Sequence, residues 1–323
     1  LIYSILRITV IFVAFLFGLF GIFIWRNLYS MIFYIIAAVF LKRYVKIPEF
    51  DLKLAVKMIK YNIYLIISNS LIQFSLNYPV LILGKIDPKE AAFFSVAFFA
   101  SNLITIFYQS LVEVGIFRLA GVKSEYEVVK KVTKYSTYIA GFLFTSYLAF
   151  GKEIINLLFS KSYVSATYPL YIMSLAFFIV SSATGITTHL LNEGDTKILA
   201  AMAGIRAALT LLLTPLIFYY RAAGAALDFS LALLASTVFA HVYAHYRNIR
   251  TGRTHVLVSL SSALPAILFG KILSLYLPTL LSVLIVPPIT TLLYISVITL
   301  LRGFDEYDRE LLLKVWDRIR AFI

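Results

Sequence analysis

The sequence has 323 residues, of which 61% are hydrophobic and only 14% are charged. Soluble domains carry about a quarter charged residues, so this composition excludes an ordinary water-soluble domain. The net charge of +13 is spread over the segments between apolar runs, which indicates a membrane-topology signal and contact with anionic lipid rather than nucleic-acid binding.

Ten runs of mostly apolar residues are predicted to cross a membrane as helices. A spanning helix needs about 20 such residues. In chain order the predicted spans are residues 5–25, 28–43, 61–83, 91–117, 133–151, 168–191, 198–219, 223–245, 255–276 and 279–301. Turn-forming pairs such as Asp87-Pro88 and Gly194-Asp195 separate them. The sequence therefore predicts an all-α fold, a polytopic membrane helix bundle of about ten helices.

Basic residues are divided unevenly between the two sets of connecting segments. One side holds 21 of the 29 lysines and arginines and the other holds 7, with Arg206 inside a span. Because cytoplasmic loops are enriched in Lys and Arg, the richer side is predicted to be cytoplasmic, and both ends of the chain lie there. The amphipathic segments 44–60 and 302–323 are predicted to be a linker and a tail at the cytoplasmic interface of the cell membrane.

Two consecutive spans each carry a stripe of polar side chains along one helical face. The stripes consist of Asn62, Asn69, Gln73 and Asn77 in the first of these spans, and of Ser95, Asn102, Gln109 and Glu113 in the second. Polar groups are costly in hydrocarbon, so they face either a water-filled cavity or a partner helix. We expect a polar cavity between these spans; interhelical hydrogen bonding is the alternative.

Three of the charged residues within predicted spans are candidates for a role in the cavity or need a partner. Glu113 could bind a coupling cation, pair with Arg118, or be an ordinary interfacial acid. Arg206 could contact an anionic head group in the cavity, or extend its side chain to the inner interface. Asp228, near the outer end of its span, is expected to reach water or Arg221.

Sequence motifs of catalysis are absent from the chain. It contains no Gly-x-x-x-x-Gly-Lys-Ser/Thr loop, no Gly-x-Ser-x-Gly and no His-Glu-x-x-His. The chain also has no cysteine, which excludes disulfides and thiolate chemistry. His241 and His245 have a spacing that can bind a metal, but no Glu follows the first histidine. We therefore expect no enzyme activity, no cofactor and no metal.

Several stretches together resemble a known family. They are Phe50-Asp51-Leu52-Lys53, Leu81-Ile82-Leu83-Gly84, Glu90-Ala91-Ala92-Phe93-Phe94-Ser95-Val96-Ala97, Glu153-Ile154-Ile155-Asn156-Leu157-Leu158-Phe159, Leu190-Leu191-Asn192-Glu193-Gly194-Asp195-Thr196-Lys197, Ala223-Gly224-Ala225-Ala226 and Arg302-Gly303-Phe304-Asp305-Glu306-Tyr307-Asp308. Their order and spacing resemble the polysaccharide-flippase (Wzx-like) branch of the multidrug/oligosaccharidyl-lipid/polysaccharide (MOP) exporter superfamily, which contains the MATE transporters.

The resemblance implies two pseudo-symmetric halves that rock around a central cavity. By this resemblance, residues 1–43 are the last two helices of the first half, 44–60 the linker, 61–245 the six helices of the second half, 246–301 two additional helices and 302–323 the tail. About four family helices would precede the first span, and the chain does not begin with Met. We therefore expect a fragment of a longer protein; a shortened protein that completes its cavity by pairing is the alternative.

The implied function is flipping of a lipid-linked oligosaccharide or polysaccharide precursor by alternating access. Its partners would be that lipid, the membrane, and a proton or sodium as coupling cation. The substrate-path candidates are Asn69, Gln73, Asn77, Ser95, Asn102, Gln109, Glu113 and Arg206. The alternatives are a drug or small-cation exporter, which needs a deep acidic site; a glycan polymerase or ligase, which needs an outer catalytic acid or arginine; and a non-transporting scaffold.

Overall fold

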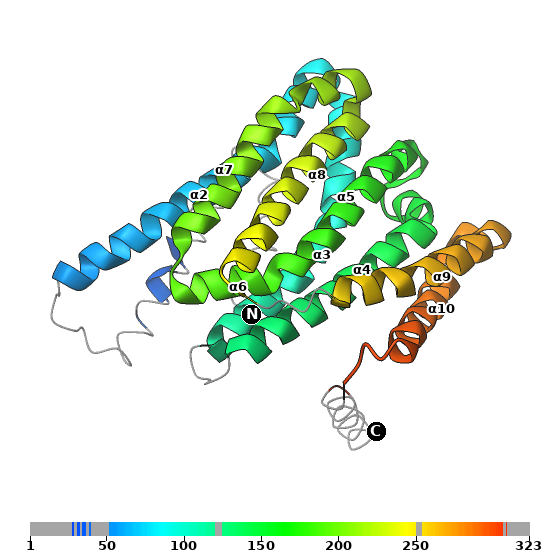
Figure 1. Cartoon of the computed structure of the whole chain (residues 1–323). Coiled ribbons are helices and arrows are strands. Elements are labelled where there is room, and N and C mark those ends of the chain that lie inside the picture. The colour runs from blue at the N-terminus through cyan, green and yellow to red at the C-terminus, as the bar shows by residue number, and fades with distance from the viewer. Residues whose placement is uncertain are drawn as a thin grey trace. The chain divides into compact units, whose positions relative to one another are not determined.

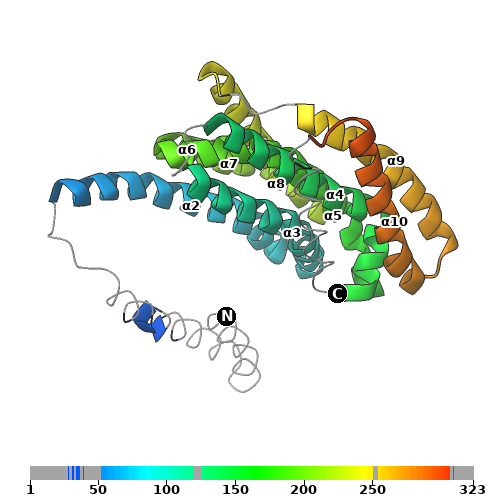
Figure 2. The ribbon, with the colours of Figure 1, turned by 90° about the horizontal axis from the view of Figure 1, so that it is seen from below.

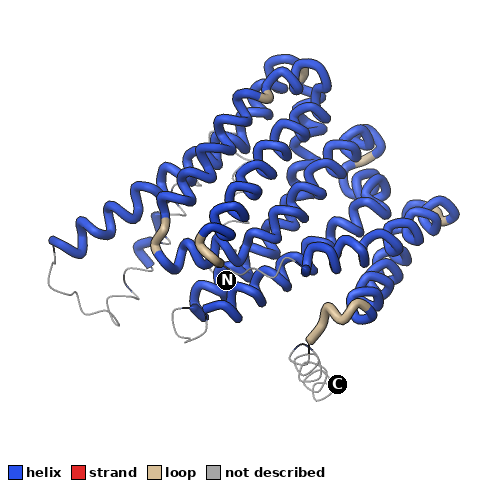
Figure 3. Tube along the Cα trace, in the orientation of Figure 1, coloured by secondary structure: helices blue, strands red, loops and turns tan. Residues whose placement is uncertain are grey.

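The computed structural model describes residues 52–119, 125–249, 254–305 and 308, together with seven residues between 28 and 39. Every regular element in this part of the chain is a helix, as Figure 3 shows. The predicted span 5–25 and all but these seven residues of the span 28–43 lie outside the described residues, as does most of the predicted tail. The chain divides into two units at residues 58 and 59, and the account below concerns the second, Ile59–Ile323.

The helices follow one another with short connections (Figure 1). They are α2 (Leu52–Ile86), α3 (Pro88–Leu119), α4 (Glu125–Phe159), α5 (Thr167–Val180), α6 (Thr184–Glu193), α7 (Thr196–Leu212), α8 (Thr214–Tyr246), α9 (Thr254–Tyr276) and α10 (Thr279–Leu300), with short 3-10 segments η1 (Lys161–Ala166) and η2 (Ser181–Ala183). Among the described residues, seven segments are long and apolar enough to cross a membrane. The prediction of an all-α membrane bundle is confirmed, and the protein is a multi-pass membrane protein.

The predicted span 198–219 is divided between α7 and α8. α7 ends at Leu212, and Pro215 lies in the first turn of α8, where its missing N–H leaves no extra group unpaired. α8 then breaks at Arg221, which has φ 53°. Glu90, in the first turn of α3, accepts a hydrogen bond of 3.0 Å from the N–H of Ala222, which caps the second part of α8. The second part of α8 therefore begins near Ala222, while the segment that is long and apolar enough to cross a membrane runs from Thr214 to Tyr246.

The linker predicted over 44–60 overlaps the beginning of α2. α2 begins at Leu52 and continues without interruption to Ile86, with Pro79 inside it. No glycine or proline lies between residues 52 and 78 to end a helix. Residues 44–51 lie outside the described part of the chain.

Close contacts hold α4 against its neighbours. The hydroxyls of Ser259 on α9 and Tyr294 on α10 lie 2.7 Å apart, and Tyr294 donates a 3.0 Å hydrogen bond to the carbonyl of Tyr138 on α4. On another side, a Cβ at Gly185 of α6 would lie 2.5 Å from the carbonyl oxygen of Val129 on α4. Figure 2 shows α9 and α10 beside α4, at the opposite end of the bundle from α2 and α7.

Candidate substrate cavity

A cavity of about 630 Å³ lies inside the bundle, between α2, α3 and the helices α5 to α8. Its lining runs along α2 from Leu65 to Leu76, along α3 from Phe98 to Val112 and along α7 from Leu199 to Arg206. These stretches extend from the middle of each helix toward the end of the bundle that holds the α6–α7 turn. The distribution of basic residues predicts that this end is cytoplasmic.

Amide side chains line two walls of the cavity. Asn69 and Gln73 come from α2, and Asn102 and Gln109 come from α3. Asn69, Gln73 and Gln109 are exposed rather than packed away, so their amide groups are open to the cavity. Each amide offers donors as well as an acceptor, which suits a hydroxyl-rich ligand.

Hydroxyl groups from several helices complete the polar lining. They belong to Ser68 on α2, Thr105 and Tyr108 on α3, Thr184 and Thr187 on α6, and Ser236 and Thr237 on α8. Some of them also stabilise the walls: Ser68 donates a 3.2 Å hydrogen bond to the carbonyl of Leu199, which joins α2 to α7. Tyr78 and Thr214 form a second α2 contact of 3.1 Å beyond the cavity.

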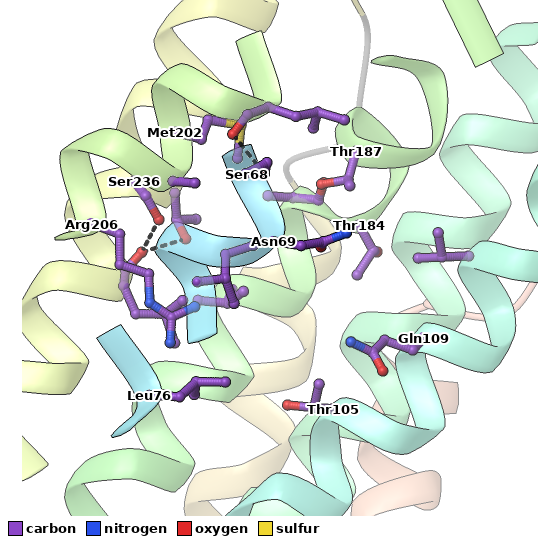
Figure 4. Close-up of a pocket in the computed structure, with 18 of the residues that line it drawn as sticks. Ser68, Asn69, Leu76, Thr105, Gln109, Thr184, Thr187, Met202, Arg206 and Ser236 are labelled. Atoms are coloured by element: carbon purple, nitrogen blue, oxygen red, sulfur yellow. Dashed lines mark hydrogen bonds between the residues drawn. The ribbon is translucent and has the colours of Figure 1, made fainter. Parts of the chain in front are cut away.

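Arg206 lies at the deep end of the cavity, on α7. Its side chain is 8% exposed, and within the described residues neither Nε nor Nη2 has a hydrogen-bond partner. The guanidinium carbon lies 4.7 Å from the ring centroid of Phe229 on α8, a cation–π contact that offsets part of the cost of burial. Figure 4 shows Arg206 on one side of the cavity and Thr105 and Gln109 on the other. The structure places Arg206 in the cavity lining, and its contact with a head group stays a prediction.

The eight predicted path residues are not all in one place. Asn69, Gln73, Asn102, Gln109 and Arg206 line the cavity, whereas Asn77, Ser95 and Glu113, which are also described, lie outside its lining. Asn77 donates to the carbonyl of Gln73 at 2.8 Å, and Ser95 donates to that of Ala91 at 2.7 Å. Glu113 is exposed beyond the last lining residue of α3.

The hydroxyls of α6 and α8 were not predicted as cavity residues. Thr184 donates to the carbonyl of Ser181 and Thr237 donates to that of Leu233, each within its own helix region. Serine and threonine bond back to the backbone in this way wherever they lie in an apolar helix, so their positions in the sequence carry no sign of a cavity.

The position of Asp228 differs from the prediction. Asp228 was expected to reach water or Arg221, but it is completely buried, and within the described residues neither of its carboxylate oxygens has a hydrogen-bond partner. The expectation is wrong because α8 packs this part of its length against neighbouring helices.

His241 lies 2.8 Å from the hydroxyl of Ser182, and the described residues contain no group of three or more His, Cys, Asp or Glu that could hold a metal.

In the described part of the chain, helices that are apolar enough to cross a membrane surround an internal polar cavity. No protein-family model and no curated protein matches the sequence. Among solved structures, the chain is similar to lipid II flippase MurJ in its inward closed conformation, with a TM-score of 0.70 and 17% identity over 96% of this chain and 67% of that chain. The likeness shows that this chain shares the helical fold of that protein.

Proposed function

We propose that this protein moves the head group of a lipid-linked oligosaccharide from the cytoplasmic to the outer face of the cell membrane by alternating access. The observation that carries the proposal is the polar cavity inside an apolar bundle, with the buried guanidinium of Arg206 at its deep end. Sugar hydroxyls need matched donors and acceptors, and the phosphate that joins sugar to lipid needs a cation. The cavity supplies both.

The dimensions and position of the cavity suit this cargo. Its volume of about 630 Å³ falls within the roughly 300–1,000 Å³ typical of ligand sites. It reaches from the predicted cytoplasmic end to mid-bundle, which is where transporters of alternating access bind their substrates. The lipid tail would stay in the bilayer while the head group occupies the cavity. Both ends of the chain would lie in the cytoplasm.

Five residues of the cavity lining are proposed to contact the head group. Asn69, Gln73, Asn102 and Gln109 would bind sugar hydroxyls, and Arg206 would bind the phosphate. Asn77, Ser95 and Glu113 remain predicted path residues, and would reach the head group only in a conformation that differs from this one. Glu113 is also the proposed site for a coupling proton or sodium ion.

Two separate observations support a lipid-linked cargo. The name of MurJ states that it flips lipid II, so the shared fold supports flipping of a lipid-linked precursor in general. The choice of an oligosaccharide over a peptidoglycan precursor rests on the sequence stretches that resemble the Wzx-like branch. Export of a drug or a small cation is disfavoured, because the described cavity lining contains no Asp or Glu and the charge of Arg206 repels a cation.

The proposal is tested by transport in proteoliposomes with the full chain. A fluorescent polyprenyl-monophosphate oligosaccharide is placed in the inner leaflet, and its appearance outside is followed by quenching. We expect the triple variant Asn69→Leu, Gln73→Leu and Gln109→Leu to fall to the protein-free rate. Normal transport by this variant, folded and reconstituted at the same level, would refute the cavity assignment.

The matched control is Ser110→Leu. Ser110 follows Gln109 in α3, is exposed outside the cavity lining, and donates to the carbonyl of Ile106 at 3.0 Å in its own helix. Because this change adds an apolar side chain at the neighbouring position without altering the cavity, transport should stay within about twofold of the unmodified protein.

A further inference from the structure

The polar lining of the cavity contains few charged residues. Arg206 is the one lining residue with an ionised side chain at neutral pH, among the residues that the structure describes. The other polar groups are neutral amides and hydroxyls. Lys197, the next basic residue on α7, is exposed, lies outside the lining and places its ammonium 5.6 Å from the ring centroid of Tyr64.

This charge distribution limits the negative charge that a bound head group can carry. A guanidinium binds a phosphate through paired N–H donors, and Arg206 has two nitrogens free of partners among the described residues for that purpose. Once the phosphate is bound, the described lining offers no second cation. A carboxylate on a sugar would then be buried without a counter-charge, which costs several kcal/mol.

The neutral lining favours uncharged sugars for a complementary reason. Gln73 and Gln109 are open to the cavity from two of its walls, and each can both donate and accept a hydrogen bond. Neutral hydroxyls have the same dual character, so a neutral sugar can satisfy the amides without introducing an unpaired charge. A carboxylate accepts only, and leaves the amide oxygens without donors.

We propose that the cavity selects lipid-linked head groups whose sugars are uncharged, with the linking phosphate as the main anionic group. This inference rests on the proposed function and adds the chemical class of the cargo. The single cation Arg206 sets the charge that the head group can carry. The amides of α2 and α3 then discriminate between hydroxyl-bearing and carboxylate-bearing sugars.

The test compares two probes in proteoliposomes containing the full chain. Both are polyprenyl-monophosphate trisaccharides, whose linking phosphodiester carries one negative charge; in the second, one hexose carries a carboxylate at C6 in place of the hydroxymethyl group. We expect the neutral probe to be transported at least about tenfold faster, given the cost of burying an unpaired charge. Equal rates would overturn this inference and leave the proposed function standing. Transport of neither probe would overturn both.

A pair of variants at one cavity position tests the electrostatic cause. Thr187 lines the cavity from α6 and is only partly buried, so a longer side chain can extend into the open space. Thr187→Lys should raise the rate of the acidic probe relative to the neutral probe by about tenfold, because it adds a counter-charge. Thr187→Gln adds similar length without charge and should leave the ratio unchanged. The same ratio in both variants would contradict the proposal.

Discussion

At the scale of single residues, Arg206 is the group on which the anion-binding account depends. Its charge is buried at the deep end of the cavity beside the ring of Phe229, and two of its nitrogens lack partners in the described structure. A cation held in this way is oriented before a ligand arrives, so less conformational freedom is lost on binding.

We predict that Arg206→Gln weakens binding of a short-chain prenyl-monophosphate trisaccharide by at least about thirtyfold. The physical reason is the loss of a buried charged hydrogen-bond partner, worth about 2 kcal/mol or more. The affinity of Arg206→Lys should lie between that of the unmodified protein and that of Arg206→Gln, because an ammonium keeps the charge but not the paired donors. The measurement is equilibrium binding of the radiolabelled probe in detergent. Unchanged binding by a folded Arg206→Gln protein would exclude Arg206 as the phosphate ligand.

Glycines provide a second test at the residue scale, because the structure separates a crowded position from an open one. A Cβ at Gly185 would overlap the hydroxyl oxygen of Thr133 and lie 2.5 Å from the carbonyl oxygen of Val129, whereas a Cβ at Gly204 would have nothing within 4 Å. Gly185→Ala should destabilise the α4–α6 contact by about 1–3 kcal/mol. Gly204→Ala should be neutral or stabilising by up to about 1 kcal/mol, since alanine favours a helix.

The measurement is thermal unfolding of both variants in the same detergent. A lower midpoint for Gly204→Ala than for Gly185→Ala would show that the α4–α6 contact is not packed as described.

At the scale of elements, the segment after α10 is fixed to α4 by a buried ionic cluster. Lys134 on α4 forms ion pairs with Asp305, at 3.1 Å, and with Asp308. The side chains of Lys134 and Asp308 are 3% and 4% exposed, whereas that of Asp305 is 53% exposed. The two aspartates also accept hydrogen bonds from each other's backbone N–H groups. The cluster therefore holds the chain that follows α10 against α4.

We predict that Asp308→Asn releases this segment, because it leaves the ammonium of Lys134 buried with less counter-charge, a change that costs about 3–5 kcal/mol. Asp305→Asn should have a much smaller effect, since an exposed ion pair contributes about 1 kcal/mol or less. Hydrogen exchange of the backbone amides of residues 303 to 308 measures the release. Equal exchange in the two variants would contradict the assignment of Asp308 as the main anchor.

The same cluster should respond to acid. Burial alone would raise the pKa of Asp305, but its hydrogen bonds to Lys134 and to the backbone of Asp308 outweigh that effect and hold the pKa below the ordinary 3.8. A carboxylate with a lowered pKa contributes stability above its ordinary pKa, and that stability is lost as pH falls through the folded value. The contribution of Asp305 to holding the segment should therefore be kept from neutral pH down to about 4 and be lost below it, and its loss should have an effect as small as that of Asp305→Asn.

At the scale of the whole molecule, much of the architecture follows from the length of apolar runs. These runs indicate the positions of the helices, because a segment in hydrocarbon must pair its backbone N–H and C=O groups by hydrogen bonds within the segment. They did not show the boundary between α7 and α8, since residues 198–219 are apolar on both sides of Thr214. The break in α8 at Arg221 does fall between the predicted spans 198–219 and 223–245, and the contact of Glu90 with Ala222 stabilises it there.

The cavity could be anticipated in part for geometrical reasons. A residue rotates by about 100° around a helix, so Asn69 and Gln73 share a face while Asn77 has turned about 80° from Asn69. Ser95 and Glu113 lie on the same face of α3 as Asn102, but Ser95 comes before the first lining residue of α3, Phe98, and Glu113 comes after the last, Val112. Depth along a helix, and the choice of α6 to α8 as the other walls, depend on tertiary packing and cannot be taken from periodicity.

The central claim is that the cavity holds the head group of a lipid-linked oligosaccharide, and the absence of cysteine allows a direct measurement. Single variants Asn102→Cys, in the cavity lining, and Ser110→Cys, outside it, are modified with a membrane-permeant maleimide in the presence and absence of the lipid. We predict that the lipid slows modification of Asn102→Cys severalfold and leaves Ser110→Cys unchanged. Equal rates at Asn102→Cys with and without saturating lipid would contradict the claim.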